Sequence, residues 1–211
     1  DQPILVPEQY SEYEMMGIED PRICFFEDSF HIVYVSASLY PPNHPKPEWS
    51  VDRAWRIRVS LARTKDFKNF ERDGVVLAEV DSKDPALFPE RFDDKICLLH
   101  REFPNIWLSM GQTWYRWDDS RVIARPRPGM WDCDRIGVGG TPIKTNQGWL
   151  LIYHGVDEKH VYRQGAMLLD LNDPTRVIAR SKEPFLEPSM EYEKNGVVSN
   201  VVFSCGAIEN D

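Results

Sequence analysis

The amino-acid sequence predicts an all-β fold, and three observations lead to that prediction. Short runs of β-branched and aromatic residues recur between turn-forming residues, a pattern typical of strands. Aromatic residues make up 12% of the 211 residues, and the 16 prolines and 12 glycines are spread along the chain instead of gathering in linkers. Apolar residues do not follow the spacing of an amphipathic helix over any long stretch.

The candidate strands are short apolar runs that end at polar or turn-forming residues. They lie at residues 23–26, 30–36, 57–62, 95–101, 106–109, 149–155, 165–170 and 201–205. The pairs Asp28-Ser29 and Asp93-Asp94 and the triplet at 146–148 have the composition of hairpin turns. Tight turns of this kind join antiparallel neighbours, so the sequence predicts antiparallel sheets.

An internal repeat organises these strands. Residues 30–34, 96–100 and 149–153 can be aligned, and this places Tyr34, His100 and Tyr153 at equivalent positions, 66 and 53 residues apart. Residues 12–17 are echoed at 191–196, an offset of 179 residues or about three periods of sixty. A four-stranded sheet with its turns fits such a period, which favours a β-propeller. A β-sandwich with chance similarity is the alternative.

The repeat also predicts the organisation of the chain. Residues 1–211 form a single β-propeller catalytic domain, with about three blades and the start of a fourth. Since three periods do not close a ring, we expect the domain to be incomplete at both ends. Residues 40–55 contain four prolines and are expected to form a long loop, and loops of this length often bind ligands.

Charge and cysteine content exclude several classes of function. With 25 basic and 34 acidic residues the formal charge is −9, which argues against binding to nucleic acid or an anionic membrane surface. No apolar run approaches the ~20 residues of a membrane helix. The four cysteines form no CxxC pair and have no histidine at metal-ligand spacing, so no metal site is predicted. Free cysteines favour a reducing compartment, and we expect a cytoplasmic protein.

Two neighbouring carboxylates are the first candidates for catalysis. When the echo of residues 12–17 at 191–196 is extended, Glu19 and Asp20 align with Val198 and Ser199. The carboxylates are therefore interpreted as belonging to one blade only, and a departure from the repeat is where function is expected. The alternative is a simple Asp-Pro turn in which Arg22 pairs with Glu19.

The residues around this pair resemble a known family. Residues 17–23 are similar to the GxEDPR motif of glycoside hydrolase family 130, the mannoside phosphorylases and their hydrolase relatives. Further segments resemble the family in the same order, at 87–90, 100–101, 135–139, 148–155, 162–166, 168–174 and 200–203. The resemblance covers essentially the whole chain. It implies a five-bladed β-propeller with the active site in a central funnel.

The resemblance also implies roles for individual residues. Asp20 corresponds to the catalytic acid, which protonates the glycosidic oxygen through a hydroxyl of the mannosyl residue, and Glu19 and Arg22 correspond to substrate-binding positions. The phosphate-binding positions correspond to Lys83, Arg101, Arg135, His154 and Tyr162. The family more often has arginine at the position of Lys83 and lysine at that of Arg135. Inorganic phosphate is then a co-substrate, and no cofactor is expected.

Each basic candidate also has an ordinary structural explanation. Lys83 fits a solvated turn residue, His154 fits a core histidine, and the two arginines fit ion pairs with nearby acids (Glu90 or Glu102 for Arg101; Asp132 or Asp134 for Arg135). Arg101 and His154, however, follow the aligned His100 and Tyr153, so they occupy one repeat position in neighbouring blades. We therefore expect Arg101, Arg135 and His154 to converge, with Asp20 facing them and making no ion pair with either arginine.

The sequence thus predicts an inverting phosphorylase that cleaves a β-mannoside oligosaccharide with inorganic phosphate and releases α-mannose 1-phosphate. A phosphorylase needs an anion site beside the sugar instead of a second carboxylate to activate water. Two alternatives remain: a β-1,2-mannosidase of the same family, and a non-catalytic glycan-binding propeller. A homo-oligomer is left open, and the acceptor sugar cannot be inferred.

Overall fold

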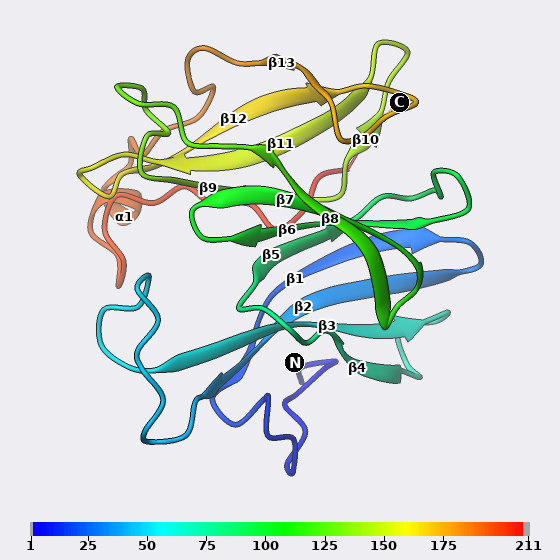
Figure 1. The fold of residues 1–211 in the computed structure, drawn as a ribbon. Coiled ribbons are helices and arrows are strands. Elements are labelled where there is room, and N and C mark those ends of the chain that lie inside the picture. The colour runs from blue at the N-terminus through cyan, green and yellow to red at the C-terminus, as the bar shows by residue number, and fades with distance from the viewer. Residues whose placement is uncertain (1, 209–211) are drawn as a thin grey trace.

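The computed structural model describes residues 2–208 and consists almost entirely of antiparallel sheet (Figure 1). Three sheets lie side by side and, over the described residues, do not close into a ring. The only helix among them is the four-residue α1 (Glu191–Lys194). No helix in this part of the chain is long and apolar enough to cross a membrane. The all-β prediction is confirmed.

Each sheet is formed by consecutive strands. The first sheet contains β1 (Gly17–Phe26), β2 (Ser29–Leu39), β3 (Trp55–Thr64) and β4 (Glu71–Leu77). The second contains β5 (Lys83–Leu87), β6 (Ile96–Glu102), β7 (Asn105–Thr113) and β8 (Arg116–Ala124). The third contains β9 (Arg135–Val138), β10 (Ile143–Lys144), β11 (Trp149–Val156), β12 (Tyr162–Leu169) and β13 (Val177–Arg180), with β9 and β10 both paired to β11.

The middle sheet carries the two hydrophobic cores. Residues 96–100 of β6 are all buried, because neighbouring sheets cover both of its faces. Ile96 and Leu98 pack into a core shared with the first sheet, whereas Cys97 and Leu99 pack into a core shared with the third. The two-residue alternation of a strand thus divides β6 between two cores. The first strands of the second and third sheets, β5 and β9, lie against the preceding sheet.

The three residues aligned by the sequence repeat occupy equivalent places. Tyr34, His100 and Tyr153 all lie, buried, on the strand that pairs with the first strand of its sheet. Each satisfies its polar group differently: the Tyr34 hydroxyl donates to Glu14 (2.9 Å), the His100 ring lies between the Ser82 and Ser109 hydroxyls (2.9 and 2.8 Å), and the Tyr153 hydroxyl donates to Asp132 (2.8 Å). The repeat is therefore one of backbone position, with different side-chain partners.

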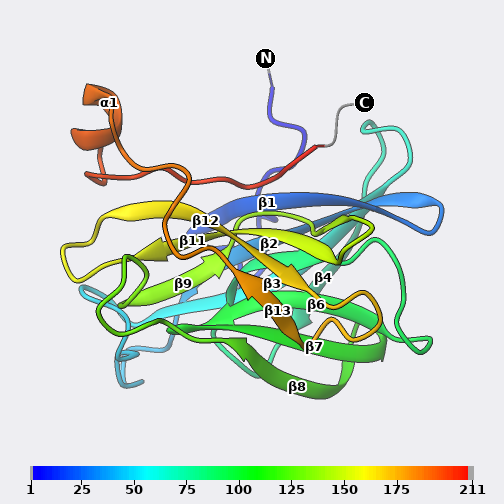
Figure 2. The same cartoon turned by 90° about the horizontal axis from the view of Figure 1, so that it is seen from above.

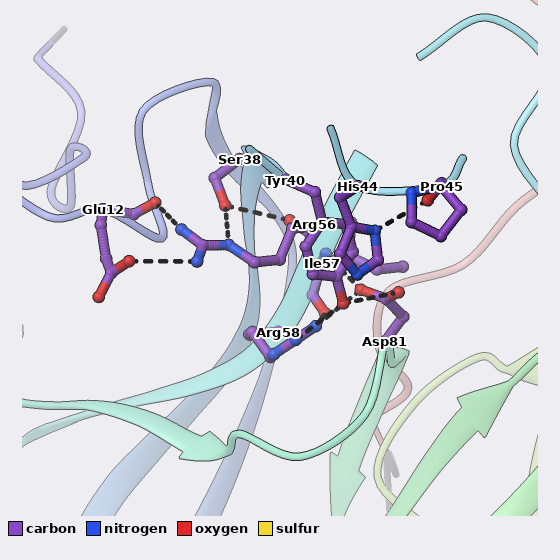
Figure 3. Close-up of polar contacts among 9 residues, drawn as sticks. All are labelled: Glu12, Ser38, Tyr40, His44, Pro45, Arg56, Ile57, Arg58 and Asp81. Atoms are coloured by element: carbon purple, nitrogen blue, oxygen red, sulfur yellow. Dashed lines mark hydrogen bonds and ion pairs between the residues drawn. The ribbon is translucent and has the colours of Figure 1, made fainter. Parts of the chain in front are cut away.

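The long loop predicted at residues 40–55 connects β2 to β3. The backbone N–H of Tyr40 donates to the carbonyl of Ala54 (2.8 Å) and closes the base of the loop. The Tyr40 ring stacks on His44 with centroids 3.8 Å apart, and its hydroxyl accepts from Arg58 (3.0 Å), as Figure 3 shows. Arg58 also donates to Asp81 (2.6 Å), which ties the loop to the start of the second sheet.

The strand predicted at residues 201–205 is wrong. In the structure Val201 forms a single parallel bridge to Tyr162, and residues 202–205 belong to no strand. Without a neighbouring strand over this length the backbone has no ladder to join. Figure 2 shows the segment after α1 crossing from the third sheet toward β1, and Phe203 accordingly contacts both His154 (ring centroids 4.6 Å apart) and the Arg22 guanidinium (5.9 Å).

We predict that Trp149→Ala strongly destabilises the fold. Trp149 is fully buried and contacts Phe88 and Phe92 of the segment between β5 and β6, with ring centroids 5.3 and 5.9 Å apart. Emptying this position should lower the free energy of unfolding by about 3–5 kcal/mol in a urea titration. Ile178→Ala, at a position 45% exposed, is the control and should change it by less than about 0.5 kcal/mol. Equal effects of the two substitutions would contradict this account of the core.

Candidate active site

Two matching bulges interrupt the first strands of the first and second sheets. In β1, Glu19 pairs with Val35 and Arg22 with Val33, so Asp20 and Pro21 together face one partner residue. Asp20 has a φ of 50°, a left-handed conformation that aspartate tolerates better than most residues. Proline has no N–H to donate to the ladder, which suits it to a bulge. The bulge bends the strand and redirects the Asp20 carboxylate.

The second sheet repeats this bulge. Lys83 pairs with Arg101 and Ala86 with Leu99, which leaves Asp84 and Pro85 in the bulge, and Asp84 has a φ of 51°. The interpretation that the Asp-Pro feature belongs to one blade only is therefore wrong. The echo between residues 12–17 and 191–196 does not align the two Asp-Pro pairs. Their own recurrence, 64 residues apart, is the signal of this repeat in the sequence.

The Asp20 carboxylate faces Lys83. Asp20 Oδ2 lies 3.5 Å from Lys83 Nζ, and Glu19 Oε2 lies 3.9 Å from the same ammonium group. The side chains of Asp20 and Lys83 are each about one quarter exposed, so solvent and ligands can reach them. Among the described residues Asp20 makes no ion pair with Arg101 or Arg135, as expected for a catalytic acid.

Four of the expected phosphate-binding residues line one cleft. Its volume is about 410 Å³, and Lys83, Arg101, Arg135 and Tyr162 form part of its wall. Arg135 donates to the Tyr162 hydroxyl (3.0 Å) and is also paired with Asp134. The lining also includes Glu48, Trp49 and Val51 from the long loop. Residues far apart in the sequence thus meet around one cleft that holds three cations and also the acidic Glu48, Asp81 and Asp134. Asp20 lies beside it, next to Lys83.

His154, the fifth expected phosphate ligand, lies behind this wall. Its Nε2 is 3.3 Å from Arg101 Nη1, so the predicted convergence of these two side chains is confirmed. Only 1% of the His154 side chain is exposed, however, and it packs between Tyr162 and Phe203. Burial lowers the pKa of His154 to about 3, so the ring is neutral at pH 7. Direct contact between His154 and phosphate stays a prediction; the geometry places the ring behind Arg101.

Arg22 lies beneath the cleft and is completely buried. Its guanidinium donates to three backbone carbonyls, those of Asp20 (3.0 Å), Val138 (2.7 Å) and Gly139 (3.3 Å). These bonds fix the backbone of the Asp20 bulge and tie β1 to β9. In the structure Arg22 supports the backbone around Asp20. The substrate contact that the resemblance implied for Arg22 stays a prediction.

Asp84 is a prominent residue of this region that the sequence reasoning missed. Its side chain is fully buried, and its carboxylate lies 3.0 Å from Arg101, 3.5 Å from His154 and 3.8 Å from Arg22. Burial acts to raise the pKa of Asp84, but the nearby cations, Arg101 foremost, outweigh it and hold the pKa well below its usual range. A charged carboxylate therefore lies directly behind the basic wall.

Comparison with known proteins identifies the family. Residues 1–211 match the family model Glyco_hydro_130, described as beta-1,4-mannooligosaccharide phosphorylase. The chain belongs to glycoside hydrolase family 130. It is 42% identical to a 1,2-beta-oligomannan phosphorylase from Thermoanaerobacter sp. (strain X514), over 100% of this chain and 67% of the relative. It is 40% identical to a beta-1,2-mannobiose phosphorylase from Listeria innocua, over 99% of this chain and 56% of the relative.

A solved structure agrees with these sequence relationships. The beta-1,2-mannobiose phosphorylase from Listeria innocua, in complex with beta-1,2-mannobiose, superposes with a TM-score of 0.86 at 39% identity. The match covers 100% of this chain and 56% of that one. This family 130 chain thus spans 67% of the length of the Thermoanaerobacter relative and 56% of the length of the Listeria innocua phosphorylase.

The structure contributes two further facts about cofactors and cysteines. Residues 2–208 contain no group of three or more histidine, cysteine, aspartate or glutamate side chains that could hold a metal ion. All four cysteines are free, and burial raises the pKa of Cys24 and of Cys97 to about 12. The expectations that the protein needs no cofactor and works in a reducing compartment stay predictions.

We predict that acid destabilises the protein already above pH 5. Burial lowers the pKa of both His100 and His154 to about 3, from an ordinary value of 6.5. Between these values the unfolded chain binds protons that the native state does not, so stability falls as the pH falls from about 6.5 toward 3. Each histidine contributes up to about 1.4 kcal/mol per pH unit.

Urea unfolding at constant ionic strength between pH 6.5 and 5 measures this dependence, above the range in which most carboxylates titrate. In His100→Gln, whose amide can bond both serine hydroxyls, part of the slope should disappear, and the rest comes from His154 and from His31, whose pKa burial also lowers. A stability that does not change over this pH range would contradict the assignment of two buried neutral imidazoles.

Proposed function

We propose that the protein is a glycoside phosphorylase that cleaves a β-mannoside with inorganic phosphate, inverts the anomeric centre and releases α-mannose 1-phosphate. The observation that carries this proposal is the basic wall of Lys83, Arg101 and Arg135 around one cleft, with the Asp20 carboxylate beside it. A chain with a net charge of −9 gathers these cations at one place, which is the requirement of an anion site. Family relatives at 40–42% identity are named mannoside phosphorylases.

In this reaction Asp20 supplies the proton. It passes through a hydroxyl of the mannosyl residue to the glycosidic oxygen, and the bond between that oxygen and the anomeric carbon breaks. Phosphate attacks the anomeric carbon from the opposite face, so a β-linkage gives an α-phosphate. Arginine donates to phosphate in bidentate fashion, and lysine adds a point charge. Phosphate bound at Lys83 also pairs with the ammonium group that faces Asp20.

We also propose that the three sheets are three consecutive blades of a five-bladed propeller. Three blades of five are three fifths of a ring, and the chain spans 56% to 67% of the relatives described above. The first strands of the second and third sheets lie near the preceding sheet, as inner strands do around a central axis. The cleft formed by strand ends and the long loop is then one side of the central funnel.

The linkage is proposed from the order of similarity. Relatives named for β-1,2-linked mannosides are 40–42% identical to this chain, whereas a beta-1,4-mannooligosaccharide phosphorylase from Ruminococcus albus is 30% identical. A β-1,2-linked manno-oligosaccharide is therefore the proposed substrate. A cytoplasmic location is retained as part of the proposal, supported by four free cysteines.

One assay tests the reaction. The full-length protein is incubated with β-1,2-mannobiose or β-1,4-mannobiose, with and without inorganic phosphate, and mannose 1-phosphate is measured. We expect phosphate-dependent release from the β-1,2-linked sugar. Mannose released at the same rate without phosphate would identify a β-1,2-mannosidase instead, and binding of the sugar without turnover would identify a glycan-binding propeller.

We predict that Asp20→Asn lowers kcat/KM for phosphorolysis by about 10²–10⁴-fold, the usual contribution of a general acid. Asparagine also tolerates a φ near 50°, so the bulge and the melting temperature should be preserved. Asp28→Asn is the matched control, because Asp28 lies in an exposed turn and pairs with Lys65. Wild-type turnover by Asp20→Asn would show that this carboxylate is only a turn residue.

A further inference from the structure

We infer that the buried carboxylate of Asp84 is a positioning residue that holds the Arg101 guanidinium in place for phosphate. Asp84 itself touches neither substrate nor phosphate, because none of its side chain is exposed. The inference rests on the proposed function, since it takes Arg101 to be a phosphate ligand.

The contacts of Arg101 support this role. Nη1 of Arg101 lies 3.0 Å from Asp84 Oδ2 and 3.3 Å from His154 Nε2, so one corner of the guanidinium fork is engaged from behind. Within residues 2–208 the Arg101 side chain forms no other hydrogen bond, although it lines the cleft. Its remaining N–H groups are thus available to a ligand, and the fork cannot rotate without leaving Asp84.

The position of Asp84 depends on two features of the backbone. The bulge with φ 51° turns its carboxylate between the second and third sheets. On the facing strand β9, a Cβ added to Gly137 would lie 2.2 Å from Asp84 Oδ2 and 2.5 Å from His154 Cε1. Only glycine leaves room there, so the sequence of β9 fits the carboxylate and the imidazole together.

Stability alone does not account for Asp84. Neither of its carboxylate oxygens has a hydrogen-bond partner of good geometry in the described residues, and a buried carboxylate left in this way costs free energy. Asp132 shows the contrast: it is equally buried, but it accepts hydrogen bonds from Tyr153, Arg127 and Arg180. A buried polar group without hydrogen bonds is expected where a residue serves a functional site and not only the stability of the fold.

Of the two arginines beside Asp84, Arg101 depends on it more. Arg22 lies farther away, at 3.8 Å, and three backbone carbonyls hold it independently. Arg101 has only Asp84 and His154 behind it. Removing the Asp84 charge should therefore release the phosphate side of the site and leave the Asp20 side in place.

The test is Asp84→Asn in the full-length protein, because asparagine keeps the shape and tolerates the left-handed backbone. We expect KM for phosphate to rise about tenfold or more, from the loss of a charge-assisted contact that fixes Arg101. KM for the mannoside should change by less than about twofold, and the pH profile of kcat should keep its shape. Gly137→Ala should have the same selective effect, because it displaces the carboxylate without removing it.

Asp132→Asn is the matched control. It also removes a buried carboxylate from two arginines, so it should lower the melting temperature at least as much, but KM for phosphate should stay at the wild-type value. An unchanged KM for phosphate in Asp84→Asn would overturn the inference. So would equal rises of both KM values in Asp84→Asn and Asp132→Asn, because these would reflect general loosening of the fold.

Calorimetric titration with inorganic phosphate separates this inference from the proposed function. Suppose the wild-type protein binds phosphate without making mannose 1-phosphate, while Asp84→Asn binds it at least about tenfold more weakly. The proposed function would then fail and the role of Asp84 would stand. Suppose instead that the wild type carries out phosphorolysis, but that the wild type and Asp84→Asn bind phosphate with identical affinity. The proposed function would then stand and the role of Asp84 would fail. A wild-type protein that binds no phosphate would overturn both.

Discussion

The candidate site depends on a left-handed aspartate before a proline at the start of two neighbouring sheets. At Asp20 this bulge presents a partly exposed carboxylate to Lys83, and at Asp84 it buries a carboxylate behind Arg101. The backbone is nearly the same in the two places, with φ values of 50° and 51°. What differs is the neighbourhood, because Asp20 faces Lys83 and solvent whereas Asp84 lies between the sheets. One backbone device thus supplies both a reactive group and its support.

The charges of the region form two layers. The outer layer, Lys83 and Arg135 together with Arg101, lines the cleft, and the inner layer of Arg22 and Asp84 is fully buried. The charges of Arg22 and Arg101 both lie beside Asp84. The negative charge of Asp84 therefore reduces the repulsion between the two arginines. A neutral His154 adds bulk and a hydrogen-bonding nitrogen without a further charge. The site thus places three cations at the cleft, while the buried layer behind them pairs one arginine with one carboxylate.

Much of the fold could be predicted from local sequence, and less of the site. The hairpin at Asp93 and Asp94 is readable because both residues adopt the positive φ values that such turns require, 47° and 61°. The strand at residues 201–205 was predicted from apolar content alone, which does not reveal whether a neighbouring strand is present to pair with it. The burial of His154 depends on Phe203 and on the facing sheet. The pattern of apolar residues in the strand that contains His154 does not reveal these contacts. The repeat position already indicated that Arg101 and His154 meet, whereas Lys83 and Arg135 were expected at this place only through family resemblance.

The division of β6 between two cores has a consequence for how the molecule unfolds. Ile96 and Leu98 serve one core and Cys97 and Leu99 the other, on a single strand. Loss of either outer sheet exposes one whole face of this strand to water. The free energies of the three sheets are therefore coupled through β6, as in repeat proteins where neighbours stabilise one another. Amide hydrogens of β6 should accordingly exchange only by the largest opening of the chain, while those at the outer edges exchange by smaller ones.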